Sequence, residues 1–314
     1  MENTQTTKHA DNGSPLPRFR HTFITPLLVG IVFLLILITR SVDFSGANGT
    51  AVDAYLSMVA VQLFIFILPC VLYIRYRSLD VRETLRIRLA SPDKIMFTAL
   101  CTLLLILLSI LVAALNHSSG GSVYSAEEIP GDASGALYFA VCFALVPALC
   151  EELLFRAVVM SEFQATSVTA AVVISSLYFA MAHFDISKFP FYFVSGLILS
   201  MCAYTTNSVI ASFFVHLGYN LFALFGGGVV EHVLGALSDT IPVLLTLGAL
   251  TLLTLTLTLG ECQRIYASNA KKNRPSGYVV KYKKGTGGVR FALALLSPMS
   301  LVLILMFIIT VLVQ

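Results

Sequence analysis

Charged side chains are scarce in this sequence. Only 12% of its 314 residues are Asp, Glu, Lys or Arg, against about 25% in a typical soluble domain. Hydrophobic residues make up 57%, and the mean hydropathy is +0.86. A soluble globule of this length would have too little polar surface to cover such a composition. The composition therefore excludes a soluble domain and predicts a chain that is surrounded largely by lipid.

Paired cysteine motifs are also absent. The six cysteines include no C-x-x-C pair, and five of them lie inside apolar runs. This pattern favours small packing residues over a disulfide framework or a cysteine-based zinc cluster.

What the sequence has instead is a series of nine apolar blocks. A helix of about 20 apolar residues crosses the roughly 30 Å of hydrocarbon in a bilayer. We therefore predict an all-α fold, a polytopic transmembrane helical bundle of eight or nine spans. The first block is too long to be a cleavable signal peptide. The blocks cover 23–39, 55–74, 95–115, 136–160, 168–184, 189–204, 209–230, 242–260 and 291–313.

Basic residues occur in some loops and are missing from others. Three stretches hold 17 of the 20 Lys and Arg residues, and the positive-inside rule places these stretches in the cytoplasm. The N-terminus is then cytoplasmic, and Gln314 lies outside. We interpret the basic stretches as topology determinants that touch anionic lipid, not as nucleic-acid sites. The basic stretches are 1–22, 75–94 and 261–290, and the loops without basic residues are 42–54, 116–135 and 231–241.

The fourth apolar block contains two carboxylates and a guanidinium. A charge at the centre of a spanning helix costs about 2.5–3.5 kcal/mol on insertion scales, so such a group indicates function. Glu152 and Arg156 are four residues apart, which is the spacing of an ion pair on one helix face. Glu151 is rotated by about 100° from Glu152 and is free to act on a substrate or a water. Pro147 predicts a kink that opens space near these carboxylates.

Two later blocks add imidazole and amide groups. His183 ends the fifth block, and His216 and Asn220 lie four residues apart in the seventh. Each residue alone is more often a hydrogen-bonded packing residue than a functional one. Their occurrence in order with the glutamates, on helices otherwise almost free of charge, favours a shared site.

These motifs resemble those of the CPBP family of intramembrane proteases, also called the Abi or type II CAAX prenyl protease-like family. The first motif falls on Glu151, Glu152 and Arg156, the second on Phe179 and His183, and the third on His216 and Asn220. The resemblance covers roughly residues 136–225. Every expected polar position is filled.

We divide the chain into four segments, of which the third carries the resemblance. Residues 1–22 form a cytoplasmic polar tail, and 23–135 form N-terminal transmembrane helices. Residues 136–230 form the catalytic transmembrane core. Residues 231–314 form C-terminal transmembrane helices with the basic cytoplasmic loop.

The implied activity is hydrolysis of a peptide bond inside the membrane. Glu151 and His183 would hold and deprotonate a water, and His216 and Asn220 would donate hydrogen bonds to the oxyanion. Glu152 would orient Arg156. Alternatively, Glu151, His183 and His216 would bind a divalent metal such as zinc, with one position left for water. The metal-independent mechanism is preferred slightly because the sequence contains no H-E-x-x-H motif.

The predicted site residues lie at different depths along their spans. At 1.5 Å per residue, Glu151 lies about 14 Å, His216 about 10 Å and His183 about 22 Å from the cytoplasmic ends of their blocks. Helix tilt, or a dip of residues 161–168 into the membrane, would bring them to one level.

Two other functions compete with a protease. Buried Glu, Arg and His residues also mark ion paths, so a transporter or channel is one alternative. We find no internal repeat of the kind that many transporters show. A non-catalytic membrane partner that regulates another membrane protein is the second alternative. As a protease, the chain would act on a membrane-associated peptide or protein, in the cell membrane of a bacterium.

Overall fold

The structure is a bundle of helices. The computed structural model describes residues 20–40, 51–88, 91–117, 124, 133–164, 166–237, 241–271 and 287–313, and these contain helices and no strand. The predicted all-α class is confirmed. The helices are α1 (Arg20–Arg40), α2 (Ala51–Tyr76), α3 (Val81–Leu85), α4 (Ile95–His117), α5 (Ala133–Ala140), α6 (Val146–Glu151), α7 (Met160–Gln164), α8 (Val168–Ala182), α9 (Phe189–Thr206), α10 (Val209–Ala236), α11 (Ile241–Lys271), α12 (Gly287–Leu295) and α13 (Pro298–Val313).

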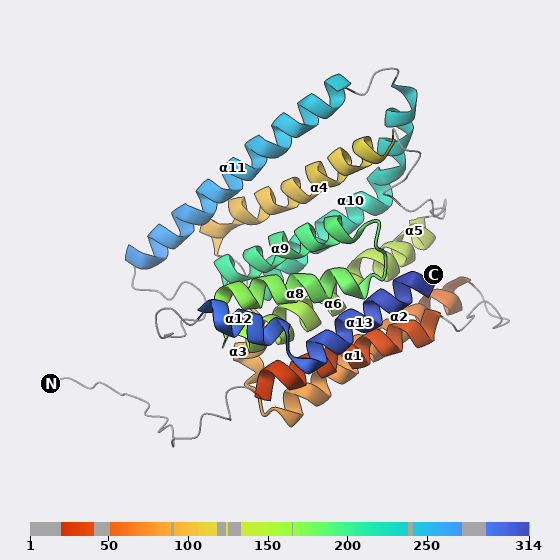
Figure 1. The fold of residues 1–314 in the computed structure, drawn as a ribbon. Coiled ribbons are helices and arrows are strands. Elements are labelled where there is room, and N and C mark those ends of the chain that lie inside the picture. The colour runs from red at the N-terminus through yellow and green to blue at the C-terminus, as the bar shows by residue number, and fades with distance from the viewer. Residues whose placement is uncertain are drawn as a thin grey trace.

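The long helices run side by side (Figure 1). At one edge, α11 packs along α4, and α4 packs on α10 and α9. In the middle, α8 packs against α9 and against the helix that contains α6. At the other edge, α1 contacts α2 and α13. The helices of the predicted catalytic core therefore lie between two groups. One group is α1, α2 and α13, and the other is the α4–α11 pair.

Six helical stretches are long and apolar enough to cross a membrane, among them the 32 residues Ala133–Gln164. Three further apolar helices are shorter: Ile24–Arg40, Val168–Ala182 and Pro298–Val313. Each of the nine predicted blocks is helical, so the chain is a polytopic membrane bundle. Which of the three shorter helices cross the bilayer stays a prediction.

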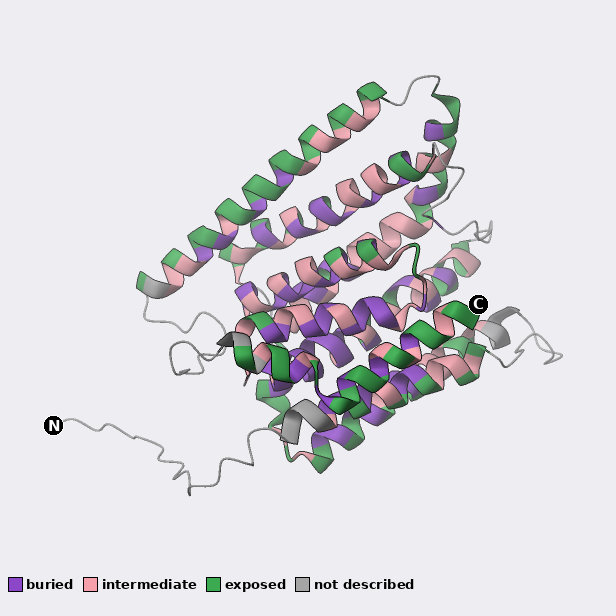
Figure 2. Cartoon of the chain, in the orientation of Figure 1, coloured by how far each residue is buried: buried purple, intermediate pink, exposed green. Residues whose placement is uncertain are grey.

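The distribution of buried residues matches a bundle immersed in lipid. Figure 2 shows α8 largely buried at the centre, whereas α11 is exposed along much of its length. The exposed side chains of α11 are large and apolar, for example Leu245 at 70% and Leu252 at 64%. A surface of this kind is stable against lipid and not against water.

Several predicted helix ends differ in the structure. The block 291–313 is two helices, α12 and α13, separated at Leu296 and Ser297, because Pro298 has no N–H with which to continue the first of them. The fourth block continues beyond residue 160 through α7. The predicted tail up to residue 19, the loop segment 272–286 and Gln314 lie outside the described residues.

Candidate active site

The helix that carries the two glutamates departs twice from α-helical geometry. A π-helical segment, Val141–Leu145, precedes α6, and a second one, Glu152–Val159, follows it. Pro147 lies in the first turn of α6. Turns of π-helix within α-helices are frequent at functional sites. Both glutamates therefore lie at a junction where the backbone hydrogen bonds change register.

Glu152, Arg156 and His216 form a buried chain of polar contacts. Glu152 Oε1 lies 3.0 Å from Arg156 Nη1 and 3.1 Å from His216 Nδ1. The side chains of Glu152 and Arg156 are 1% and 0% exposed. The predicted ion pair is confirmed, and it compensates two charges that would each be costly to bury alone.

Phe179 is the apolar centre of this cluster. The Arg156 guanidinium carbon lies 4.3 Å from the Phe179 ring centroid, a cation–π contact, and Arg156 Nη2 donates to the Gly196 carbonyl at 3.3 Å. The same ring meets His183 and His216 edge-on, at centroid distances of 5.0 and 5.7 Å. Phe179 thus fixes the positions of Arg156 and both histidines at once.

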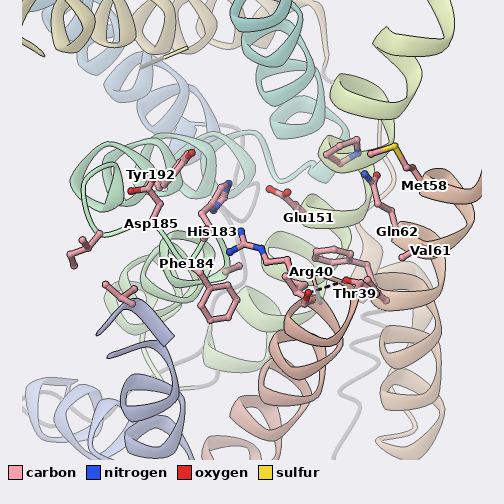
Figure 3. Close-up of a pocket in the computed structure, with 17 residues that line it drawn as sticks. Thr39, Arg40, Met58, Val61, Gln62, Glu151, His183, Phe184, Asp185 and Tyr192 are labelled. Carbon is pink, nitrogen blue, oxygen red and sulfur yellow. Dashed lines mark hydrogen bonds between the residues drawn. The ribbon is translucent and has the colours of Figure 1, made fainter. Parts of the chain in front are cut away.

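Glu151 faces the other way, into a cavity of about 810 Å³ between α1, α2, α6 and the start of α9. Figure 3 shows Glu151, His183 and Tyr192 on the wall of this cavity. Glu151 Oε2 lies 3.9 Å from His216 Nε2 and makes no hydrogen bond to a described residue. Its carboxylate is therefore available to a molecule in the cavity, whereas that of Glu152 is held by Arg156 and His216.

His183 is held by its backbone and by an aromatic neighbour. Its Nδ1 lies 2.9 Å from the Phe179 carbonyl oxygen, which can only accept. The Nδ1 atom therefore carries the proton, and Nε2 presents a lone pair. The ring stacks on Tyr192 at a centroid distance of 3.8 Å and an angle of 20°. His183 thus lines the cavity in a fixed orientation and tautomer.

Asn220 lines a second cavity of about 40 Å³ together with His183 and His216. Its Nδ2 donates to the Ala144 carbonyl at 3.4 Å, and Gln62 Nε2 donates to the Cys142 carbonyl at the same distance. Both carbonyls belong to the π-helical segment before Pro147, so these two amides support the distorted backbone. The Asn220 amide nitrogen has a second N–H, which the bond to Ala144 does not use.

The helix lengths in the structure reduce the predicted depth mismatch between Glu151 and His183, and the tilt of the helices in the bilayer stays a prediction. Because the helix of the fourth block runs to Gln164, Glu151 lies about 20 Å from its end at 1.5 Å per residue. His183 lies about 22 Å from the start of α8, so these two residues are at one level without a dip of 161–168.

Arg86, in the connection from α2 to α4, links the helix of the two glutamates to the start of α10. Arg86 Nη2 donates to the Arg156 carbonyl at 2.6 Å, and the Arg86 carbonyl accepts from Val209 N at 3.4 Å. The side chain is 5% exposed, and burial lowers the pKa of its guanidinium to about 10. Arg86 therefore ties the start of α10, the helix of His216, to the helix of the glutamates.

The proposed metal ligands do not fit a metal in this arrangement. Among the residues that the structure describes, no group of three His, Cys, Asp or Glu side chains is placed to hold an ion. Hydrogen bonds at Nδ1 to Glu152 and to the Phe179 carbonyl leave Nε2 of each histidine free, as metal-binding histidines also do, so the lack of fit rests on placement alone. Glu151 and His183 line the larger cavity, whereas His216 lines the smaller one with His183.

Two residues at the cavity were not identified from the sequence. Arg40, the last residue of α1, donates to the His183 carbonyl at 3.0 Å. Tyr192 lines both cavities and stacks on His183. Arg40 follows an apolar block, where a basic residue usually anchors a helix end, and Tyr192 is one of 12 tyrosines. Neither position has a sequence pattern that distinguishes it.

Comparison with known proteins gives one match. Residues 133–222 match the family model described as type II CAAX prenyl endopeptidase Rce1-like. This segment contains all six predicted site residues, and the match confirms the resemblance on which they were chosen. No curated protein and no solved structure matches the chain. The family is one of proteases, so the match supports a peptidase.

Proposed function

We propose that this protein is an intramembrane endopeptidase of the CAAX-protease-like type, with Glu151 as the general base. One observation carries the proposal: of two adjacent glutamates, Glu152 is buried with its Oε1 held by Arg156 and His216, whereas Glu151 is 17% exposed and faces the cavity. The matched family model covers this segment.

The proposed reaction begins with a water between Glu151 and His183. The Glu151 carboxylate takes a proton from the water, and the water's other hydrogen is hydrogen-bonded to the lone pair of His183 Nε2. The water oxygen forms a bond to the carbonyl carbon of the peptide. The C–N bond then breaks, and the proton on Glu151 passes to the leaving nitrogen.

The oxyanion of the tetrahedral intermediate needs hydrogen-bond donors. His216 would donate from Nε2, while its Nδ1 stays in contact with the Glu152 carboxylate. Asn220 would donate its second N–H. One well-placed donor of this kind contributes about 3–4 kcal/mol to the transition state. Because the described residues do not converge on a metal, no step of this proposal uses one.

The substrate would be a membrane-associated peptide or protein. The N-terminus of the protease itself would lie in the cytoplasm. Mass spectrometry of the membrane peptides tests the activity whichever protein is cleaved. Cells with the wild-type protein should contain cleaved termini that are absent from cells with Glu151→Gln. Glu261→Gln, at a surface ion pair with Arg264, is the matched control and should leave the termini present. Identical peptides in all three strains would contradict the proposal.

A further inference from the structure

Three basic residues lie outside the cytoplasmic stretches: Arg40, Arg156 and Lys188. The positive-inside rule disfavours basic residues in the other loops, so each calls for a local reason. Arg156 has its reason in the ion pair with Glu152. Arg40 makes no ion pair with any residue that the structure describes. Arg40 is exposed, so its charge is accessible to water or to a molecule bound in the cavity.

The Arg40 side chain turns into the main cavity and is not directed away from the protein. Its Nη2 donates to the His183 carbonyl, and its guanidinium carbon lies 5.5 Å from the Phe184 ring centroid. Figure 3 shows the guanidinium beside His183, in the cavity that Glu151 faces. A guanidinium has five N–H donors, and the bond to His183 uses one of them.

The remaining lining of the cavity defines what can bind there. Much of it is apolar, including Ile36, Met58, Ile65 and Val311. The nearby acid Asp185 accepts hydrogen bonds from Ser187 and from the Lys188 backbone, so it is engaged locally. Arg40 is the one basic side chain in the described lining, which also contains the carboxylates of Glu151 and Asp185. Because Arg pairs with carboxylates through two parallel hydrogen bonds, its guanidinium suits an apolar segment that carries a carboxylate.

We infer that Arg40 forms a carboxylate-binding subsite for the peptide substrate, next to the reacting groups. This inference rests on the proposed function, because it assigns part of the substrate to the same cavity. The carboxylate is either the C-terminus of the peptide or an Asp or Glu side chain. Both have the same chemistry, and both would hold the peptide in the cavity that Glu151 and His183 line.

Binding measurements test the subsite independently of catalysis. The Glu151→Gln protein, which should not turn substrate over, is reconstituted in nanodiscs with a labelled apolar peptide of about ten residues. The peptide is prepared with a free C-terminus, with a C-terminal amide, and as an amide containing one internal Glu. A charge-assisted pair should tighten binding of an acidic form by about 10- to 100-fold over the uncharged amide.

The variants attribute this preference to one side chain. Arg40→Gln should remove it, Arg40→Lys should retain part of it, and Arg40→Glu should make the uncharged amide the better ligand. Lys188→Gln, on the same side of the membrane but outside the cavity lining, should retain the full preference. Thermal unfolding of each variant establishes that it is folded.

The peptide forms distinguish the two sources of the carboxylate. Preference for the free C-terminus assigns the site to a terminal carboxylate, and preference for the internal Glu assigns it to a side chain. Equal binding of all forms, absence of binding, or a preference that survives Arg40→Gln overturns the subsite. Arg40-dependent binding without cleavage by the wild-type protein would retain the subsite and refute the proposed function.

Discussion

Glu151 and Glu152 are neighbours in the chain, yet the helix gives their carboxylates different surroundings. Glu152 is 1% exposed and contacts both Arg156 and His216, whereas Glu151 is 17% exposed and faces the cavity. The same chemical change should therefore have different consequences at the two positions. Glutamine keeps the shape of the side chain and removes its charge.

Glu152→Gln should destabilise the protein strongly. It leaves Arg156 charged at 0% exposure without its acidic partner, and breaking a buried pair in this way costs about 3–5 kcal/mol. Glu151→Gln should leave the unfolding temperature unchanged or raise it, because it removes a charge that has no such partner. Thermal unfolding in detergent measures both. Equal losses of stability in the two variants would refute the different roles assigned to them.

Asn220 distinguishes the oxyanion mechanism from the metal mechanism. If its second N–H contacts the oxyanion, Asn220→Ala should lower kcat by about 10²–10³-fold with little change in KM. The steady-state kinetics of the purified variant measure both constants.

Metal removal is the complementary measurement for the same prediction. The wild-type protein should stay active after thorough treatment with chelators, because the described residues do not converge on an ion. Activity that is lost to a chelator and recovered with zinc would replace the oxyanion mechanism with the metal mechanism. It would leave the protease assignment intact.

For single residues, sequence patterns identified those that have a helical spacing to a partner or that are charged within an apolar run. The Glu152–Arg156 pair was predictable because residues four apart share a helix face. Arg40 and Tyr192 were not, because their importance arises from where α1 ends and α9 begins relative to His183. The bond from Asn220 to Ala144 depends on a π-helical distortion that no local sequence rule specifies.

Among the elements, α8 and α9 make the closest approach that bears on the site. A Cβ atom at Gly196 would lie 2.9 Å from Ser176 Cα, which is closer than atoms at that position tolerate. The Gly196 carbonyl also accepts from Arg156. The contact between these helices therefore holds the guanidinium as well as the bundle.

Gly196→Ala should separate α8 from α9 and disturb Arg156. We expect a loss of about 1–3 kcal/mol of stability, the usual cost of overpacking, together with reduced activity. Gly260→Ala is the matched control, because its Cβ would meet no atom within 4 Å and Ala favours a helix by about 1 kcal/mol over Gly. Thermal unfolding and peptide cleavage are measured for both variants. Equal stability and equal cleavage activity of the two variants would contradict the role assigned to the α8–α9 contact.

The existence of the helices was predictable, but their ends and depths were not. Hydropathy located all nine blocks, because each is a continuous apolar run. It missed the break before Pro298 within an apolar run and the extension of the fourth block through Glu162. Glu162 is buried, and its Oε2 lies 3.3 Å from Arg77 Nη2. A charged residue that appears to end a span is therefore part of the helix.

For the whole molecule, the fold class followed from composition because lipid is the only solvent that suits such a surface. The orientation in the bilayer rests on the basic stretches and stays a prediction. Topology reporters fused after Lys284 and after Gln314 should give opposite signals, cytoplasmic for the first and external for the second. A reporter after residue 120 should match the one after Gln314. Equal signals from the first two fusions would show that the last block does not cross.

The central claim concerns Glu151, and the purified protein tests it most directly. A peptide identified from the cellular comparison is incubated with wild-type protein and with Glu151→Gln, both in nanodiscs, and the new termini are quantified by mass spectrometry. We predict cleavage by the wild type and none by Glu151→Gln, with unfolding temperatures that are equal or slightly higher in the variant. Cleavage at the wild-type rate by folded Glu151→Gln protein would contradict the account.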